Sequence, residues 1–79
     1  MFLRHVPLKC RDVESALTTL GFRPEQQGGT SHVHWVKVEN GRMWKVTVDC
    51  HKGEVRANDV KSIVKQAGVT RRKFYEALP

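Results

Sequence analysis

Two stretches of the chain place hydrophobic residues at the spacing of an amphipathic helix. In residues 11–20, positions i, i+3, i+4 and i+7 hold Val13, Ala16, Leu17 and Leu20. In a second stretch, after Asn58 and Asp59, the apolar positions are Val60, Ile63, Val64 and Ala67. We expect Asp12 to cap the first helix and Gly21 to end it. Asn58 or Asp59 should cap the second helix, and Gly68 should end it.

A different periodicity occupies the centre of the chain, where two runs rich in Val and Trp flank Asn40-Gly41. Asn-Gly between alternating runs predicts a β-hairpin with a two-residue type I′ turn, in which cross-strand partners have numbers that sum to 81. The side of the hairpin that faces the helices then holds Val33, Trp35, Trp44, Val46, Val48 and Cys50. The opposite side places His32 across from Asp49 and His34 across from Thr47.

Shorter segments complete the predicted fold. Residues 23–27 are expected to form an edge strand, a place that tolerates Pro24, followed by a turn at Gly28-Gly29. A last short helix, capped by Thr70, should point Phe74 and Leu78 inward. The order is α-β-β-β-α with a short C-terminal helical extension. It predicts an α+β two-layer sandwich, a three-stranded antiparallel sheet with helices on one face, as one domain over residues 1–79.

Size and charge narrow the function. The 79 residues include 14 Lys+Arg against 8 Asp+Glu, a formal net charge of +6 that favours polyanionic partners, nucleic acid first. A domain this small buries too little surface for a deep cavity, so we expect any active site to be shallow. No apolar run approaches the roughly 20 residues that span a bilayer, and no signal peptide is evident. We therefore expect a cytoplasmic protein, with Cys10 and Cys50 as small buried residues and not as a bridge.

Three ordered segments resemble the HicA family of small toxins, the mRNA interferases of toxin–antitoxin systems. They are Ala-Leu-Thr-Thr-Leu-Gly-Phe at residues 16–22, Gly-Thr-Ser-His-Val at residues 29–33, and a third segment that combines Val-Thr-Val at 46–48, His-Lys-Gly-Glu-Val at 51–55 and Ser-Ile-Val-Lys-Gln-Ala-Gly-Val at 62–69. The resemblance covers about residues 12–78. It implies a fold like that of a double-stranded RNA-binding domain, which matches the order derived above independently.

The resemblance also implies a site. His32 matches the catalytic histidine of the family, and Thr30 stands where the family commonly has Ser. Asp49 departs from the family pattern, which often has Pro after the Val-x-Val strand. His51 matches a histidine that the family often has there, and we favour a loop or RNA-contact role for it over that of general acid. The implied activity is endonucleolytic cleavage of mRNA, which inhibits translation.

The chemistry of RNA cleavage suits these residues. RNA supplies its own nucleophile, the 2′-hydroxyl, so a ribonuclease needs a proton acceptor, a proton donor and cations near the phosphate, and no metal. Histidine can fill the acid or base role near neutral pH. We expect His32 to be catalytic and Asp49 to orient its ring. Further substrate contacts are expected from Thr30, His34, Arg42, Lys45 and Lys52.

Partners and alternatives complete the interpretation. The resemblance implies an mRNA substrate and a HicB-type antitoxin that covers the active face, with the chain as a monomer or in a toxin–antitoxin hetero-oligomer. We expect no cofactor, no metal and no membrane. A zinc site from His32, His34, Cys50, His51 and Cys10 is disfavoured, because the predicted register puts Cys50 and His32 on opposite faces. The main alternative is a non-catalytic double-stranded RNA-binding module of the same fold.

Overall fold

The computed structural model describes residues 6–25 and 32–79. Within these ranges the elements in chain order are β1 (Leu8–Lys9), α1 (Cys10–Thr19), β2 (Arg23–Pro24), β3 (His32–Glu39), β4 (Arg42–Asp49), β5 (Glu54–Val55), α2 (Ala57–Ala67) and α3 (Arg71–Glu76). The described strands β2, β3 and β4 form an antiparallel sheet in that order. The predicted α+β layout, α-β-β-β-α followed by a short helix, is confirmed. The sequence pattern did not predict the small antiparallel sheet of β1 and β5.

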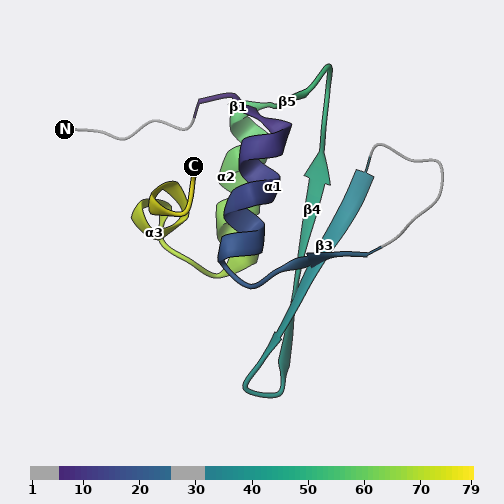
Figure 1. Ribbon diagram of the computed structural model, residues 1–79, viewed down its shortest axis with the longest axis vertical. Helices are drawn as coiled ribbons and strands as arrows, with labels where there is room; N and C mark the ends of the chain where they lie inside the picture. Colours follow the sequence, from purple (N-terminus) through teal and green to yellow (C-terminus); the bar gives the residue numbers. More distant parts are fainter. Residues whose placement is uncertain (1–5, 26–31) are drawn as a thin grey trace.

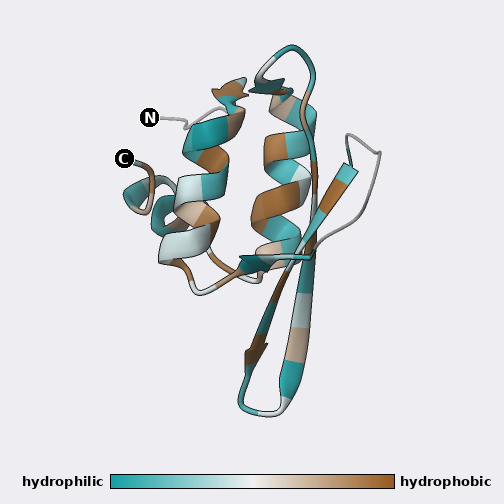
Figure 2. Ribbon diagram, turned by 45° about the vertical axis from the view of Figure 1, so that its right-hand side comes forward, coloured by the Kyte–Doolittle hydropathy of each residue, from teal (hydrophilic) through white to brown (hydrophobic). Residues whose placement is uncertain are grey.

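The helices lie on one side of the β3–β4 hairpin, and the turn of the hairpin projects beyond them (Figure 1). Along α1 and α2, hydrophobic and hydrophilic residues alternate as expected for amphipathic helices (Figure 2). The predicted apolar stripes are buried apart from Leu20, which is partly buried, and the sheet contributes Trp35, Val46 and Val48 to the same core. Near the hairpin turn, Val38 and Met43 are exposed on the opposite side of the sheet.

The register of the hairpin is the one that Asn40-Gly41 predicts. The numbers of each cross-strand pair of β3 and β4, from Glu39–Arg42 to His32–Asp49, sum to 81. Asn40 has φ 53° and Gly41 has φ 76°, the two positive values that a type I′ turn requires. Because side chains alternate across a strand, His32, His34, Lys45, Thr47 and Asp49 share the face that the helices leave open.

The helix starts differ from the predicted caps. α1 begins at Cys10, with Lys9 in the cap position and no side-chain cap, so the expectation for Asp12 is wrong. The start of α1 involves a contact distant in sequence: the backbone N–H of Cys10 donates to the carbonyl of Gly53 at 2.9 Å, which satisfies one of the N–H groups that the first helical turn leaves without an intrahelical partner. α2 similarly begins after Arg56 without a side-chain cap, ahead of both predicted cap residues.

The other end of α2 matches the prediction and is tightly constrained. Gly68 ends the helix in the left-handed region at φ 71°. A Cβ built on Gly68 would collide with the indole ring of Trp44. Thr70 then caps α3 as predicted, its hydroxyl accepting a hydrogen bond from the backbone N–H of Lys73 at 3.1 Å. Phe74 is fully buried, so α3 is anchored to the core.

Cys10 and Cys50 form a disulfide, with their Cα atoms 6.0 Å apart. The expectation of two unpaired cysteines is therefore wrong, and the cysteines no longer support the inference of a reducing compartment. The bond joins the first residue of α1 to the residue that follows β4. A pair separated by 40 positions cannot be inferred from two cysteines without knowing that these two ends meet.

Candidate active site

The candidate site lies where β3 begins and β4 ends. His32 and Asp49 are cross-strand partners, and Nε2 of His32 lies 3.2 Å from Oδ2 of Asp49. The side chain of His32 is 57% exposed and that of Asp49 is 23% exposed, so a phosphodiester could approach the ring without any opening of the fold. The pairing expected from the hairpin register is thus present as a direct contact.

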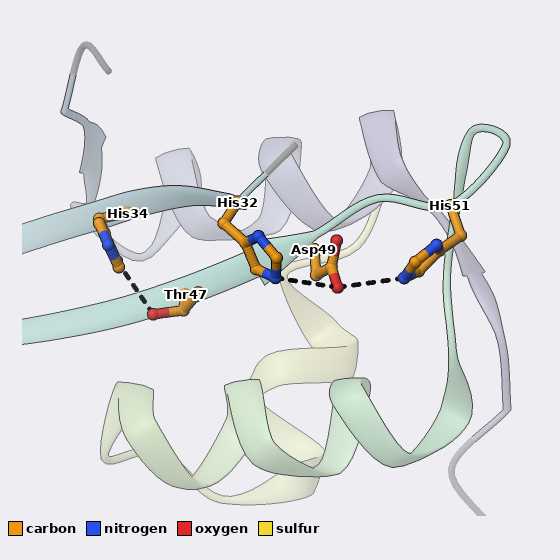
Figure 3. Close-up of polar contacts among 5 residues, drawn as sticks. All are labelled: His32, His34, Thr47, Asp49 and His51. Carbon is orange, nitrogen blue, oxygen red and sulfur yellow. Dashed lines mark hydrogen bonds and ion pairs between the residues drawn. The ribbon is translucent and has the colours of Figure 1, made fainter. Parts of the chain in front are cut away.

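His51 completes a row of three side chains, with Asp49 between the two histidines (Figure 3). Nε2 of His51 lies 3.0 Å from the same Oδ2 atom that contacts His32. A carboxylate accepts hydrogen bonds and does not donate them, so Nε2–H of His51 is the donor in this bond, and in a neutral ring the lone pair then lies on Nδ1. Asp49 thus holds His51 by a hydrogen bond and His32 by a contact between Nε2 and the same oxygen.

The backbone around His51 is held from both sides. On the N-terminal side, Cys50 is bonded to α1 through the disulfide. On the C-terminal side, His51 and Glu54 exchange two backbone hydrogen bonds, of 2.7 and 2.9 Å, across a tight turn. Lys52 and Gly53 form that turn with φ values of 51° and 81°. His51 is thus fixed by covalent and hydrogen-bonded constraints, unlike a side chain on a long open loop.

His34 lies on the same face but belongs to a separate contact. Its Nδ1 is 3.0 Å from Oγ1 of Thr47, its cross-strand partner, and the pair is partly buried. The backbone N–H of Thr47 in turn donates to Oε1 of Gln66 on α2 at 2.9 Å. These bonds fix the open edge of β4 next to the site. The structure keeps His34 near His32 without linking it to Asp49.

The basic residues expected to bind substrate do not form one cluster. Lys45 is on the face of His32, and its Nζ lies 3.5 Å from Oε1 of Glu25 with both side chains largely exposed. Arg42 is at the far end of the hairpin and on the other face, with its guanidinium 3.9 Å from the ring centre of Trp44. Lys52 lies in the turn after His51 and lines a shallow hollow with Lys9 and Arg11. Lys45 and Lys52 thus flank the site, whereas Arg42 does not.

The remaining expectations concern Thr30 and metals. Thr30 falls outside the described residues. Within the described ranges, no group of three or more His, Cys, Asp or Glu side chains is arranged to hold a metal ion. Both cysteines are in the disulfide, so neither can serve as a thiolate ligand in this state. Among the same residues, no helix has the length and apolar character needed to cross a bilayer.

The contact between His51 and Asp49 was not predicted from the sequence. Asp49 and His51 are two positions apart, and in extended chain such residues point to the same side. Combined with the register that places His32 across from Asp49, this spacing would have indicated a three-residue row. The signal was weak because β4 ends at Asp49, and alternation cannot be assumed beyond the end of a strand.

Comparison with known proteins identifies the family of the chain. No curated protein and no solved structure matches the chain. The family model described as the HicA toxin of bacterial toxin–antitoxin systems matches residues 10–69, from the first residue of α1 to just beyond the end of α2. The match includes the whole hairpin, the His32–Asp49 pair and His51. By this match over most of its length, the chain belongs to the HicA toxin family.

Proposed function

We propose that this protein is an mRNA endonuclease that uses His32 as a proton-transfer residue and requires no metal ion. The observation that carries the proposal is the contact between His32 and Asp49 on the face of the sheet that the helices leave uncovered. A histidine held by a carboxylate is the arrangement that orients imidazole bases in other enzymes. Membership of the HicA family supports a toxin role for such a site.

In the proposed reaction, His32 accepts the proton of a ribose 2′-hydroxyl. The 2′-oxygen forms a bond to the adjacent phosphorus while the bond from phosphorus to the 5′-oxygen breaks, and the departing oxygen takes up a proton. The products are a 2′,3′-cyclic phosphate and a free 5′-hydroxyl. Asp49 receives no proton in this scheme: it positions the ring of His32 through its contact with Nε2.

The surroundings of the site suit an anionic polymer. The chain carries a net charge of +6, and the exposed Lys45 and Lys52 precede and follow Asp49 in the sequence. Phosphate contacts of this kind position RNA without reading its sequence. Cleavage of mRNA would stop translation, which is the effect expected of a toxin in this family.

A toxin of this family implies a cognate antitoxin. We propose a HicB-type protein that covers the open face of the sheet and thereby blocks His32. An acidic surface on this partner would complement the positive charge of the toxin and speed association. We propose that the chain acts in the cytoplasm, where mRNA is present, alone as a monomer or bound to the antitoxin in a hetero-oligomer.

The test is cleavage of mRNA by the purified chain in excess EDTA, with the His32→Ala variant alongside. We expect the parent to cut and the folded variant to bind RNA with similar affinity without cutting. Analysis of the cut ends should find the cyclic phosphate. Lys61→Ala, on the exposed side of α2, is the control for expressing and purifying a variant protein, and it should cut like the parent.

The rival function is RNA binding without catalysis. A binding module would retain RNA in both the parent and the His32→Ala protein and would cut in neither. It would also fail to arrest growth when expressed without an antitoxin. Either result, obtained with protein that binds RNA and is folded, would reject the endonuclease proposal.

A further inference from the structure

We infer that His51 is the second proton-transfer residue of this site and protonates the departing 5′-oxygen while His32 deprotonates the 2′-hydroxyl. The inference rests on the proposed function and extends it to the general acid. It is carried by the shared carboxylate: Oδ2 of Asp49 lies 3.2 Å from Nε2 of His32 and 3.0 Å from Nε2 of His51.

RNA cleavage by this route needs two groups in two places. The attacking 2′-oxygen and the leaving 5′-oxygen lie on opposite sides of phosphorus, so one imidazole cannot be within hydrogen-bond reach of both at once. The two Nε2 atoms on Asp49 are at most about 6 Å apart, since both contact one oxygen, and the rings extend away from it on opposite sides (Figure 3). The two rings therefore lie on either side of one carboxylate, near enough together for one phosphodiester to contact both.

The two rings would use the same nitrogen atom, Nδ1, for opposite proton transfers. In both rings Nε2 lies against the carboxylate, so Nδ1 is the atom that faces away from Asp49 and exchanges a proton with RNA. His32 acts with Nδ1 unprotonated and His51 with Nδ1 protonated. In the reaction the proton of the 2′-hydroxyl moves to Nδ1 of His32, and the Nδ1 proton of His51 moves to the 5′-oxygen as the bond from phosphorus to that oxygen breaks. Exchange with water restores both rings.

His51 is better placed for this role than the other groups near the site. It is 45% exposed, so RNA can reach it, yet its backbone is fixed by the disulfide at Cys50 and by the paired turn to Glu54. Such fixing is what a proton donor needs, because small displacements of a catalytic group cost much of its effect. His34, by contrast, has its Nδ1 bonded to Oγ1 of Thr47.

The experiment compares two substrates with the parent and the His51→Ala variant. The first is a dinucleotide with an ordinary 5′-oxygen leaving group. The second is a nucleoside 3′-phosphate ester of p-nitrophenol, whose leaving group departs without being protonated. We expect His51→Ala to lose roughly 10²- to 10⁴-fold in cleavage of the dinucleotide and less than a few-fold with the ester. His32→Ala should lose activity with both substrates, because both need the base.

Two results would overturn the inference. Equal loss with both substrates in a folded His51→Ala protein would assign His51 a structural or base role. Unchanged cleavage of the dinucleotide would remove it from the reaction. If the parent itself cleaves neither substrate nor RNA, the proposed function fails, and this outcome is distinct because it does not depend on the variant. Lys61→Ala is again the matched control.

Discussion

The disulfide between Cys10 and Cys50 joins the start of α1 to the backbone between two residues of the candidate site. Cys50 stands directly between Asp49 and His51, and Cys10 is the residue whose N–H donates to Gly53 in the next turn. The disulfide therefore helps to hold β1 next to β5, and it fixes the segment that carries His51. It links the stability of the fold to the geometry of the site.

Reduction of the disulfide should therefore destabilise the protein. A loop closed over 40 positions is worth about 3–4 kcal/mol in the chain-entropy model. We expect urea unfolding of the reduced parent to occur at a clearly lower midpoint than that of the oxidised parent. Cys10→Ala and Cys50→Ala should each remove the difference between oxidising and reducing buffer. If both cysteines of the native, non-reduced protein react with a thiol reagent, the disulfide is not present.

Replacement of Asp49 should reduce cleavage without abolishing it. The Asp49→Ala variant loses the carboxylate that contacts both Nε2 atoms, so the rings of His32 and His51 are no longer held in one orientation. Loss of a group that orients a functional histidine typically costs about 10- to 100-fold. We expect the cleavage rate at saturating RNA to fall. The affinity for RNA should be unchanged or higher, because a negative charge is removed. A rate equal to that of the parent would exclude Asp49 as a positioning residue.

Gly68 should tolerate no side chain. Its positive φ already disfavours other residues, and a Cβ would overlap the ring of Trp44, which packs against the core. We expect Gly68→Ala to lower the free energy of unfolding by about 1–3 kcal/mol, through strain and displacement of the indole. Gly41→Ala is the comparison: it also has a positive φ, but nothing lies within 4 Å of its Cβ position. Denaturant unfolding should rank Gly68→Ala as the more damaging.

The hairpin could be predicted from sequence because its determinants are local. Asn40-Gly41 fixes the turn, the turn fixes the register, and the register places His32 across from Asp49. The identity of His32 as the expected catalytic residue came from family resemblance, since an exposed histidine on a strand has no chemical signature of its own. The turn residues and the family resemblance together thus predicted the His32–Asp49 pair of the candidate site.

What the sequence did not predict depends on contacts between distant segments. The start of α1 is set by Gly53, 43 positions from Cys10, and the disulfide requires the same two ends to meet. The position of His51 beside Asp49 depends on the path of the chain after β4 ends, where side chains need not alternate between the two faces of a sheet. The expected clustering of Arg42 with Lys45 is not found, because the register places Arg42 on the face of Trp44 and Lys45 on the opposite face.

RNA binding should distinguish Lys45 from Arg42, two basic residues on the same strand. Lys45 shares the open face with His32, and its contact with Glu25 is an exposed ion pair that costs little to exchange for a phosphate. Arg42 lies on the other face, about 23 Å of strand from Asp49. We expect Lys45→Ala to weaken RNA binding and to reduce the slope of log affinity against log salt by about 1, whereas Arg42→Ala changes neither. Titration of His32→Ala protein with labelled RNA at several salt concentrations measures both without cleavage. Equal effects of the two substitutions would show that RNA reaches the hairpin turn and contacts both faces of the sheet.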